Sequence, residues 1–365
     1  MRRSAVLAWV LSLCPDLRLS QRKTLGELVH ACLRTGRVNL AELGRNIDSP
    51  AAAKHRIKRA CRFCANHRVH AAEAMTGTVR RLCRRGEPLL VALDWVEVRA
   101  FHTLVAAAVV GGRAVPLLWA SYPEWVLRKS QNNLEEGLLR LLRSLIPDRV
   151  PVILLADRGF GRAEMAVCCR DLRFHFVIRI KPDVSVAHRR YTGKLSDYPV
   201  KKGVRRVLSG ASYRSDGRVT LNVVVRWKKG LPEKRDEPWF LITDLGKRQA
   251  VAVSELYGRR MGIEELFRDQ KSLRNGSALR LTKIRRADRF DRLLLVLAVA
   301  YLLLTGIGLI ARARCRPSEW CANTRPGECS AFTIGRVMVD RLTVTPAQAF
   351  VAVLRASEEP ARNWG

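Results

Sequence analysis

The sequence predicts an α/β protein in which buried strands alternate with helices. Three near-continuous apolar runs occupy most of residues 89–119, separated by short turns, and runs of this kind are typical of buried strands. Leucines at helical spacing follow at residues 132–146, and two further strand patterns at 151–157 and 174–181 enclose a second helix. Strands that alternate with helices in this way pack as a sheet covered by helical layers.

The bulk composition indicates a folded protein that binds a polyanion. The 365 residues leave room for two or three domains with a sizeable buried core. Lysine and arginine number 66 against 33 aspartates and glutamates, which gives a formal net charge of +33. So large an excess favours nucleic acid as the partner, with an anionic membrane surface second. The hydrophobic fraction of 48% argues against disorder.

The first 86 residues predict a basic, helical region. A capped helix begins near Ser20, a short helix follows at residues 38–45, and a third occupies much of residues 49–63. A short helix, a turn and a basic helix are typical of a helix-turn-helix DNA reader. A basic helix that touches phosphates without reading sequence is the alternative, and both interpretations are open. The candidate DNA-binding residues of the third helix are Lys54, Arg56, Lys58, Arg59 and Arg62.

The ten cysteines do not predict a disulfide framework, because no secretory leader with a cleavage site precedes them. The apolar start at residues 1–14 gives way at once to polar sequence, so we expect an amphipathic first helix in a reduced, cytoplasmic protein. Cys61, Cys64, His67 and His70 are spaced too closely for the common structural zinc pattern. Buried thiols and surface histidines are the favoured interpretation of this segment.

Residues 293–311 form an apolar run of nineteen positions without a charge. At about 1.5 Å per residue a helix of this length could just span a bilayer. Arginines flank the run at both ends, so the charge asymmetry that normally orients a membrane helix is missing. A fully buried core helix is therefore the favoured interpretation.

Two acids stand out because they belong to strands that should be buried. Asp94 lies inside the first apolar run, and Asp157 ends the run at residues 151–157. An unpaired carboxylate is costly to bury, so we expect both to face a cleft or a metal ion. The working site of an α/β sheet lies beyond the carboxyl ends of its strands. Asp94 can point across to Asp157 at that edge.

A third acid lies on a helix predicted over residues 257–271. Tyr257, Arg260, Glu264 and Lys271 are separated by three, four and seven positions, and these steps place all four side chains on one helix face. A solvated charged face is the ordinary interpretation of such a run. Together with the two strand aspartates, however, Glu264 completes a set of hard oxygen ligands suited to magnesium. Two such ions about 3.5–4 Å apart can promote phosphoryl transfer.

These acids belong to motifs that stand in a fixed order along the chain. With them, the sequence resembles the DDE transposases of bacterial insertion sequences, in particular the insertion-sequence-four family. The resemblance covers residues 89–311 well, and the N-terminal helices and the C-terminal tail only loosely. The motifs are Leu93-Asp94-Trp95, Gly111-Gly-Arg-Ala-Val-Pro116-Leu-Leu-Trp119, Ala156-Asp157-Arg158-Gly159-Phe160 and, above all, Tyr257-X2-Arg260-X3-Glu264-X6-Lys271.

The resemblance implies an RNase H-like catalytic core, a mixed sheet flanked by helices, with an antiparallel β insertion and an N-terminal helical DNA-binding domain. By this resemblance Asp94, Asp157 and Glu264 are the catalytic and metal-binding triad. They would hold two magnesium ions (Mg2+), for which manganese (Mn2+) can substitute. Glu265 is the neighbouring acid, but the motif spacing selects Glu264.

The same resemblance implies specific DNA contacts. Tyr257, Arg260 and Lys271 would grip phosphates near the cleaved end, which agrees with the hydrogen-bond donors that these side chains carry. Trp239 matches an aromatic residue of the insertion that stacks on a flipped base. A strand tryptophan packed on the core is the alternative for Trp239, and both interpretations are open.

The predicted chain organisation has five parts. They are residues 1–86 (helical DNA-binding domain), 87–181 (first part of the catalytic core), 182–246 (basic antiparallel β insertion), 247–314 (second part of the core, with the signature helix) and 315–365 (a loose C-terminal tail).

As a transposase, the protein would bind the ends of its element and cut and join DNA by in-line displacements at phosphorus. The implied partners are double-stranded DNA, as terminal inverted repeats and as target, and a second copy of the chain in a homodimer. We expect cytoplasmic, nucleoid-associated action and no membrane partner. One alternative is a DNA-binding protein of the same family without catalytic activity, either an inhibitor or a decayed copy. A membrane protein built on residues 293–311 is the third interpretation.

Overall fold

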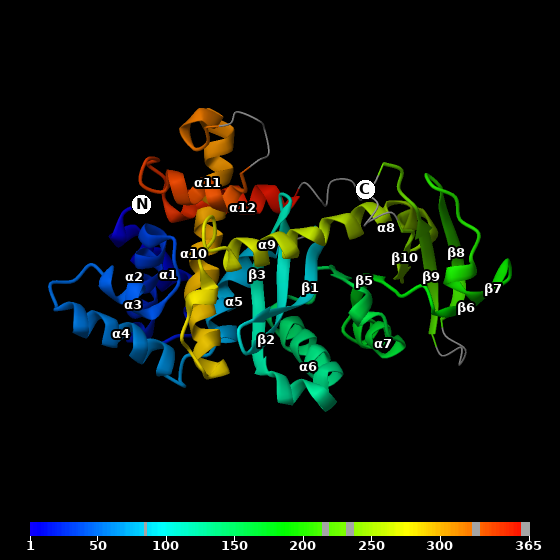
Figure 1. The fold of residues 1–365 in the computed structure, drawn as a ribbon, viewed down its shortest axis with the longest axis horizontal. Coiled ribbons are helices and arrows are strands. Elements are labelled where there is room, and N and C mark those ends of the chain that lie inside the picture. The colour runs from blue at the N-terminus through cyan, green and yellow to red at the C-terminus, as the bar shows by residue number, and fades with distance from the viewer. Residues whose placement is uncertain (84–85, 214–218, 231–236, 323–328, 359–365) are drawn as a thin grey trace.

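The protein is a mixed α/β structure in which one large sheet is flanked by helices (Figure 1). In Figure 1, α8 and α9 run along the upper side of the sheet, whereas α6 and α7 lie below it. The computed structural model describes residues 1–83, 86–213, 219–230, 237–322 and 329–358.

Helices fill the N-terminal region, as the sequence predicts. α2 ends at Gly36, whose φ of 61° suits a residue without a Cβ. The Asn39 side chain caps α3 by accepting a hydrogen bond from the Glu42 N–H at 2.9 Å. Within residues 1–83 the helices are α1 (Arg3–Leu13), α2 (Leu19–Thr35), α3 (Leu40–Arg45), α4 (Ala53–Ala65) and α5 (Ala71–Leu82).

The sheet contains ten strands in the order β3-β2-β1-β4-β5-β10-β9-β8-β6-β7. β1, β4 and β5 are parallel to one another, and every other neighbouring pair is antiparallel. The strands are β1 (Leu89–Val98), β2 (Phe101–Val110), β3 (Arg113–Pro123), β4 (Val152–Ala156), β5 (Phe174–Arg179), β6 (Ser185–His188), β7 (Tyr191–Lys194), β8 (Arg205–Tyr213), β9 (Val219–Arg226) and β10 (Trp239–Thr243).

The predicted β insertion extends the core sheet and does not form a sheet of its own. β10 pairs antiparallel with β5, and its register partners include Leu241 with Arg179. β6, β7, β8, β9 and β10 all lie within the residues predicted as an antiparallel β insertion, and their pairings with one another are antiparallel. The insertion therefore continues the sheet that carries the strand acids.

Helices α6 (Glu124–Leu145) and α7 (Ala163–Asp171) connect the parallel strands. α6 begins directly after Pro123, eight residues before the predicted start. The first turns were missed because residues 124–131 lack the repeated leucines that marked the rest of the helix. Between β10 and the C-terminal region lie α8 (Lys247–Arg259), α9 (Met261–Lys271) and α10 (Ala287–Arg314).

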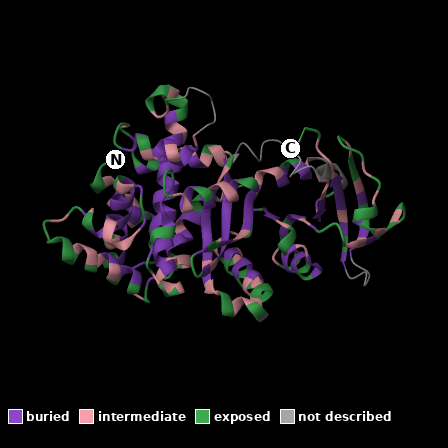
Figure 2. Ribbon diagram, viewed as in Figure 1, coloured by how far each residue is buried: buried purple, intermediate pink, exposed green. Residues whose placement is uncertain are grey.

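α10 is the buried core helix that the apolar run predicts. It is long and apolar enough to cross a membrane, yet 94% of its most apolar window lies inside the protein. Figure 2 shows it buried along most of its length, with the N-terminal helices on one side and the sheet on the other. Its length and composition therefore reflect its central position in the core.

The expectation of a loose C-terminal tail is wrong for the part of the tail that the structure describes. α11 (Ala331–Met338) and α12 (Pro346–Glu358) pack against α10 and bury Phe332, Phe350 and Val353. Three glycines allow the close approach: a Cβ at Gly308 would lie 1.7 Å from the Ala331 carbonyl oxygen, and Gly306 and Gly335 are similarly confined. The short helices were missed because each offers few turns of periodic sequence.

We expect Gly308→Ala to lower the free energy of unfolding by at least about 2 kcal/mol, because the new methyl group overlaps a backbone oxygen that can move only if α11 shifts. Gly137→Ala on α6 is the matched control, since nothing lies within 4 Å of a Cβ there. It should stabilise the protein by about 0.5–1 kcal/mol. Urea unfolding measures both, and an unchanged midpoint for Gly308→Ala would contradict this packing.

Candidate active site

Asp94 lies within β1, and Asp157 directly follows the carboxyl end of the neighbouring parallel strand β4. The last register pair of β1 and β4 is Leu93 with Ala156, so the two aspartates are the next residues on neighbouring strands. Asp157 Oδ1 accepts a hydrogen bond from the Gly159 N–H at 2.8 Å, which closes the tight turn after β4. This is the edge of the sheet at which the sequence predicts a site.

The predicted signature helix is two helices that meet at Arg260. The Arg260 N–H bonds to the Tyr257 carbonyl at 3.0 Å, and the Ile263 N–H bonds to the Arg260 carbonyl at 3.0 Å. These i to i+3 bonds tighten the turn between α8 and α9. The expectation of one unbroken helix is wrong here, because helix periodicity does not reveal a single-residue break.

α9 lies directly on the sheet. A Cβ at Gly262 would come within 2.7 Å of the Arg113 carbonyl oxygen on β3, so only glycine allows this approach. Glu264, two residues later on the same helix, lies near enough for its charge to act on Asp94. Lys271 Nζ reaches the Glu97 carbonyl oxygen at 3.5 Å. The strand acid and the signature residues therefore come from distant parts of the chain to one place.

Arg260 is the cation of this site. Its Nη1 donates to Asp94 Oδ2 at 3.0 Å, and its Nη2 donates to Glu264 Oε1. The guanidinium also lies over the Tyr257 ring, with 5.8 Å from Cζ to the ring centroid. The Arg260 side chain is 8% exposed, against 41% for Glu264. A buried charge is tolerated when it is paired, and here two carboxylates pair with one guanidinium.

The acids are strongly coupled through their charges. Burial, together with the charges of Asp157 and Glu264, raises the pKa of Asp94 to about 6, although Arg260 opposes the shift. An acid in this state gains from any additional cation nearby. The donor set of three carboxylates therefore fits a hard divalent ion. Among the described residues, however, no three His, Cys, Asp or Glu side chains lie close enough together to hold a metal ion.

A family model described as "Transposase DDE domain" matches residues 86–303, which is more than half of the chain. The chain belongs to this family. No curated protein matches the chain. The matched segment begins just before β1 and ends within α10, so it contains every residue of the site described above. Members of the family are transposases that cleave and join DNA, and they generally depend on divalent metal ions.

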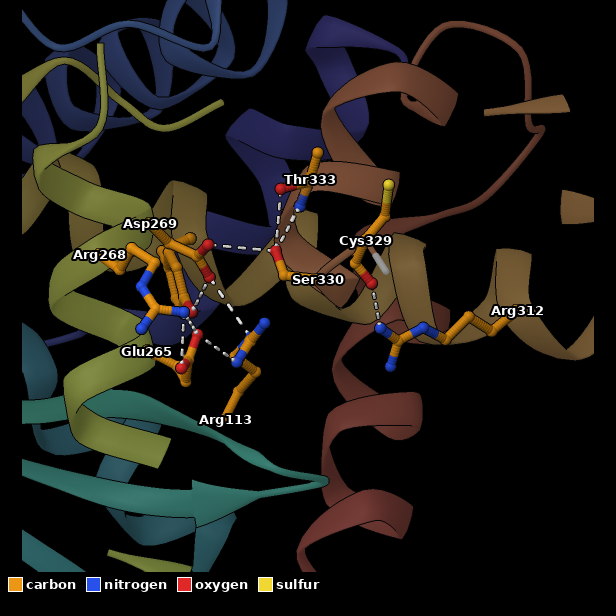
Figure 3. Close-up of polar contacts among 9 residues, drawn as sticks. Arg113, Glu265, Arg268, Asp269, Arg312, Cys329, Ser330 and Thr333 are labelled. Carbon is orange, nitrogen blue, oxygen red and sulfur yellow. Dashed lines mark hydrogen bonds and ion pairs between the residues drawn. The ribbon is translucent and has the colours of Figure 1, made fainter. Parts of the chain in front are cut away.

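The structure separates the two adjacent glutamates of this DDE domain. Glu264 turns toward Arg260, whereas Glu265 turns toward Arg113, whose Nη1 lies 3.1 Å from Glu265 Oε2, and toward Arg268 (Figure 3). Glu265 is therefore neutralised away from Asp94. This arrangement agrees with the motif spacing that selects Glu264.

Asp269 is a buried acid of α9 that the sequence did not single out. Its carboxylate accepts hydrogen bonds from the Tyr301 hydroxyl at 3.0 Å and from the Ser330 hydroxyl at 3.1 Å (Figure 3). Arg113 Nε lies 3.5 Å from it. These contacts join the helix that carries Glu264 to α10, α11 and β3. No local signal could reveal them, because the partners lie far away in the chain.

Tyr257 and Trp239 form an aromatic pair next to Arg260. Their ring centroids are 5.1 Å apart in an edge-to-face arrangement, and Tyr257 is 5% exposed. Lys228 Nζ lies 4.9 Å from the Trp239 ring centroid, and Trp239 is half-buried. Tyr257 thus contacts Arg260 and Trp239 in the protein interior, and Trp239 packs on the core as the alternative interpretation predicted.

The basic residues of α4 lie apart from the acids. Figure 1 places α4 beyond α10, on the side away from β1. Lys54, Lys58 and Arg62 are exposed, while Arg56 and Arg59 are half-buried. Arg56 is fixed by donating to the Ile47 carbonyl oxygen at 2.8 Å. The helix borders a groove of about 400 Å3 that it shares with α2.

We expect Arg260→Gln to destabilise the metal-free protein by about 3 kcal/mol at pH 8, because two carboxylates lose their buried cation. The pKa of Asp94, already raised by burial, should rise further. For an acid whose folded pKa exceeds its unfolded value, the penalty is full at high pH and fades as pH falls toward the unfolded value.

The loss caused by Arg260→Gln should therefore shrink between pH 8 and pH 5 in urea unfolding with a chelator present. Arg268→Gln is the control, since this arginine is 69% exposed and pairs only at the surface. An equal loss for Arg260→Gln at both pH values would count against the carboxylate coupling.

Proposed function

We propose that the protein is the transposase of a bacterial insertion sequence of the insertion-sequence-four kind. It would bind the ends of its element, cleave them and transfer the freed strands to target DNA by a cut-and-paste route. The observation that supports this most directly is that one buried arginine pairs with Asp94 and Glu264, while Asp157 follows the strand next to that of Asp94. A purely DNA-binding role gives no reason to bring acids to the centre of so basic a protein.

Asp94, Asp157 and Glu264 would hold magnesium, in two sites, with manganese as a substitute. When bound, the ions would supply the Lewis acidity that in-line displacement at phosphorus requires. A phosphate group of DNA offers Arg260 a new anionic partner, so the guanidinium can exchange a carboxylate for a phosphate oxygen. Lys271 is suited to the same task. Burial and the charge of Arg280 lower its pKa, so a phosphate beside it would stabilise the protonated ammonium group.

Tyr257 would affect DNA binding indirectly. Its ring is buried against Arg260, so it would hold that guanidinium in place for a phosphate. Trp239 packs beside Tyr257, and by the family resemblance its ring would stack on a flipped base when DNA is bound.

A basic ridge offers DNA a path from the acids to the N-terminal helices. Between residues 271 and 289 the only acid is Asp288. A groove of about 630 Å3 separates the end of this segment from α3 and α4. Arg99 fixes the ridge to the sheet by donating to the Arg280 carbonyl oxygen at 3.2 Å. The cations of the ridge are Lys271, Arg274, Arg280, Lys283, Arg285, Arg286 and Arg289.

The remaining features of the proposal rest on the family resemblance. The core would be RNase H-like, residues 1–86 would form a helical DNA-binding domain, and the segment boundaries would follow the predicted order. Two chains would act as a homodimer on paired element ends, at the nucleoid. The inverted repeats of the element and the target DNA would be the partners.

Glu264→Gln should abolish magnesium-dependent cleavage of a supercoiled plasmid that carries the element ends, with a loss of at least about 1,000-fold, while end binding persists. Glu265→Gln is the matched control, since this neighbour is held by Arg113 and Arg268. It should retain cleavage within about tenfold. Cleavage by Glu264→Gln at the normal rate would refute the assignment, and no cleavage by the natural protein would favour the inactive DNA-binding alternative.

The triple variant Lys283→Gln, Arg285→Gln, Arg289→Gln should weaken binding of duplex DNA and reduce the slope of log K against log salt by about 2–3, since each lost phosphate contact removes close to one unit. A control triple, Arg80→Gln, Arg128→Gln and Arg140→Gln, removes the same charge from exposed positions on α5 and α6. Equal slopes for the two triples would show that the ridge is not the path.

A further inference from the structure

Glu135 is a buried acid that the proposed chemistry does not use. It lies on α6 and is 1% exposed. Its Oε1 accepts hydrogen bonds from Trp95 Nε1 at 2.8 Å and from Gln131 Nε2 at 3.1 Å. Its Oε2 pairs with Nη1 of Arg162, which is also buried. Both carboxylate oxygens are therefore occupied by directed contacts.

The two main partners of Glu135 lie in the chain segments that carry Asp94 and Asp157. Trp95 follows Asp94 directly on β1. Arg162 ends the tight turn that begins at Asp157, and its N–H bonds to the Phe160 carbonyl at 2.8 Å. One carboxylate thus ties together the two chain segments that carry the aspartates.

Glu135 acts from the other side of the sheet. Successive side chains of a strand point to opposite faces, so Trp95 points away from the face to which Asp94 points. Glu135 on α6 accepts its hydrogen bond from Trp95 on that second face, whereas Asp94 pairs with Arg260. Glu135 therefore touches neither DNA nor a metal ion held by Asp94, and its influence must pass through Trp95 and Arg162.

Stability alone does not account for this arrangement. A buried ion pair costs much of what it gains, and apolar residues of similar size often stabilise a protein equally well. The carboxylate instead fixes geometry. Because it accepts hydrogen bonds from an indole N–H and a guanidinium, it sets the distance and the angle of both groups. Groups that support metal ligands in this way commonly change metal affinity by about 10–100-fold.

We propose that Glu135 is a positioning residue that sets the separation of Asp94 and Asp157 through Trp95 and Arg162. The inference rests on the proposed function, since it assumes that the two aspartates share metal ions. Glu135→Gln keeps an acceptor for Trp95 but removes the charge that holds Arg162. Glu135→Leu removes both contacts.

Manganese binding to the full-length protein, measured by calorimetry without DNA, tests the proposal independently of turnover. We expect Glu135→Gln to weaken binding about tenfold and Glu135→Leu to weaken it more, with end binding of DNA retained. Arg143→Gln is the matched control on α6. This half-buried arginine is anchored to the carbonyl oxygens of Ile146 and Pro147, with no contact to either aspartate segment.

The control should lose stability in urea unfolding while its manganese affinity stays within about twofold of the natural protein. Folded Glu135 variants with unchanged manganese affinity would overturn the positioning role and leave the proposed function intact, provided that the natural protein binds manganese and cleaves end DNA. If the natural protein binds no manganese, the proposed function and the positioning role both fail.

Discussion

The salt bridge from Arg260 to Asp94 and Glu264 is the interaction on which the arrangement of the chain depends. Carboxylates that lie near one another and partly out of solvent repel, and Arg260 offsets this repulsion from the junction of α8 and α9 by pairing with Asp94 and Glu264. From this junction the guanidinium reaches Asp94 on β1 and Glu264, which lies four residues further along the chain. One arginine therefore links the signature helices to the strand that carries the first acid.

Arg260 can hold this position only because α9 is fixed on three sides. Gly262 seats the helix on β3, Asp269 joins it to α10 and α11, and Arg113 neutralises the acids on its outer side. Because the partners of Asp269 lie on helices that pack closely through glycines, the C-terminal helices belong to the support of the active site. A chain cut before α11 would lose one of the three supports.

The sequence was informative wherever an acid interrupted a strong pattern. Asp94 and Asp157 stood out against apolar strands, and Glu264 followed from the spacing of Tyr257 and Arg260. Asp269, Glu135 and the C-terminal helices were missed for a different physical reason. Their roles arise from contacts between residues far apart in the chain, and neither helix periodicity nor local charge encodes such contacts.

Charge is distributed unequally between the site and its surroundings. The net charge is +33, yet the centre of the site brings three carboxylates together with Arg260 and Lys271. In the proposed function, the basic ridge would draw the DNA backbone toward a centre that repels phosphate. DNA and acids can then meet only if further cations enter between them. In the proposed function, bound divalent ions would offset the negative charge of the acids and would also supply the chemistry of the reaction.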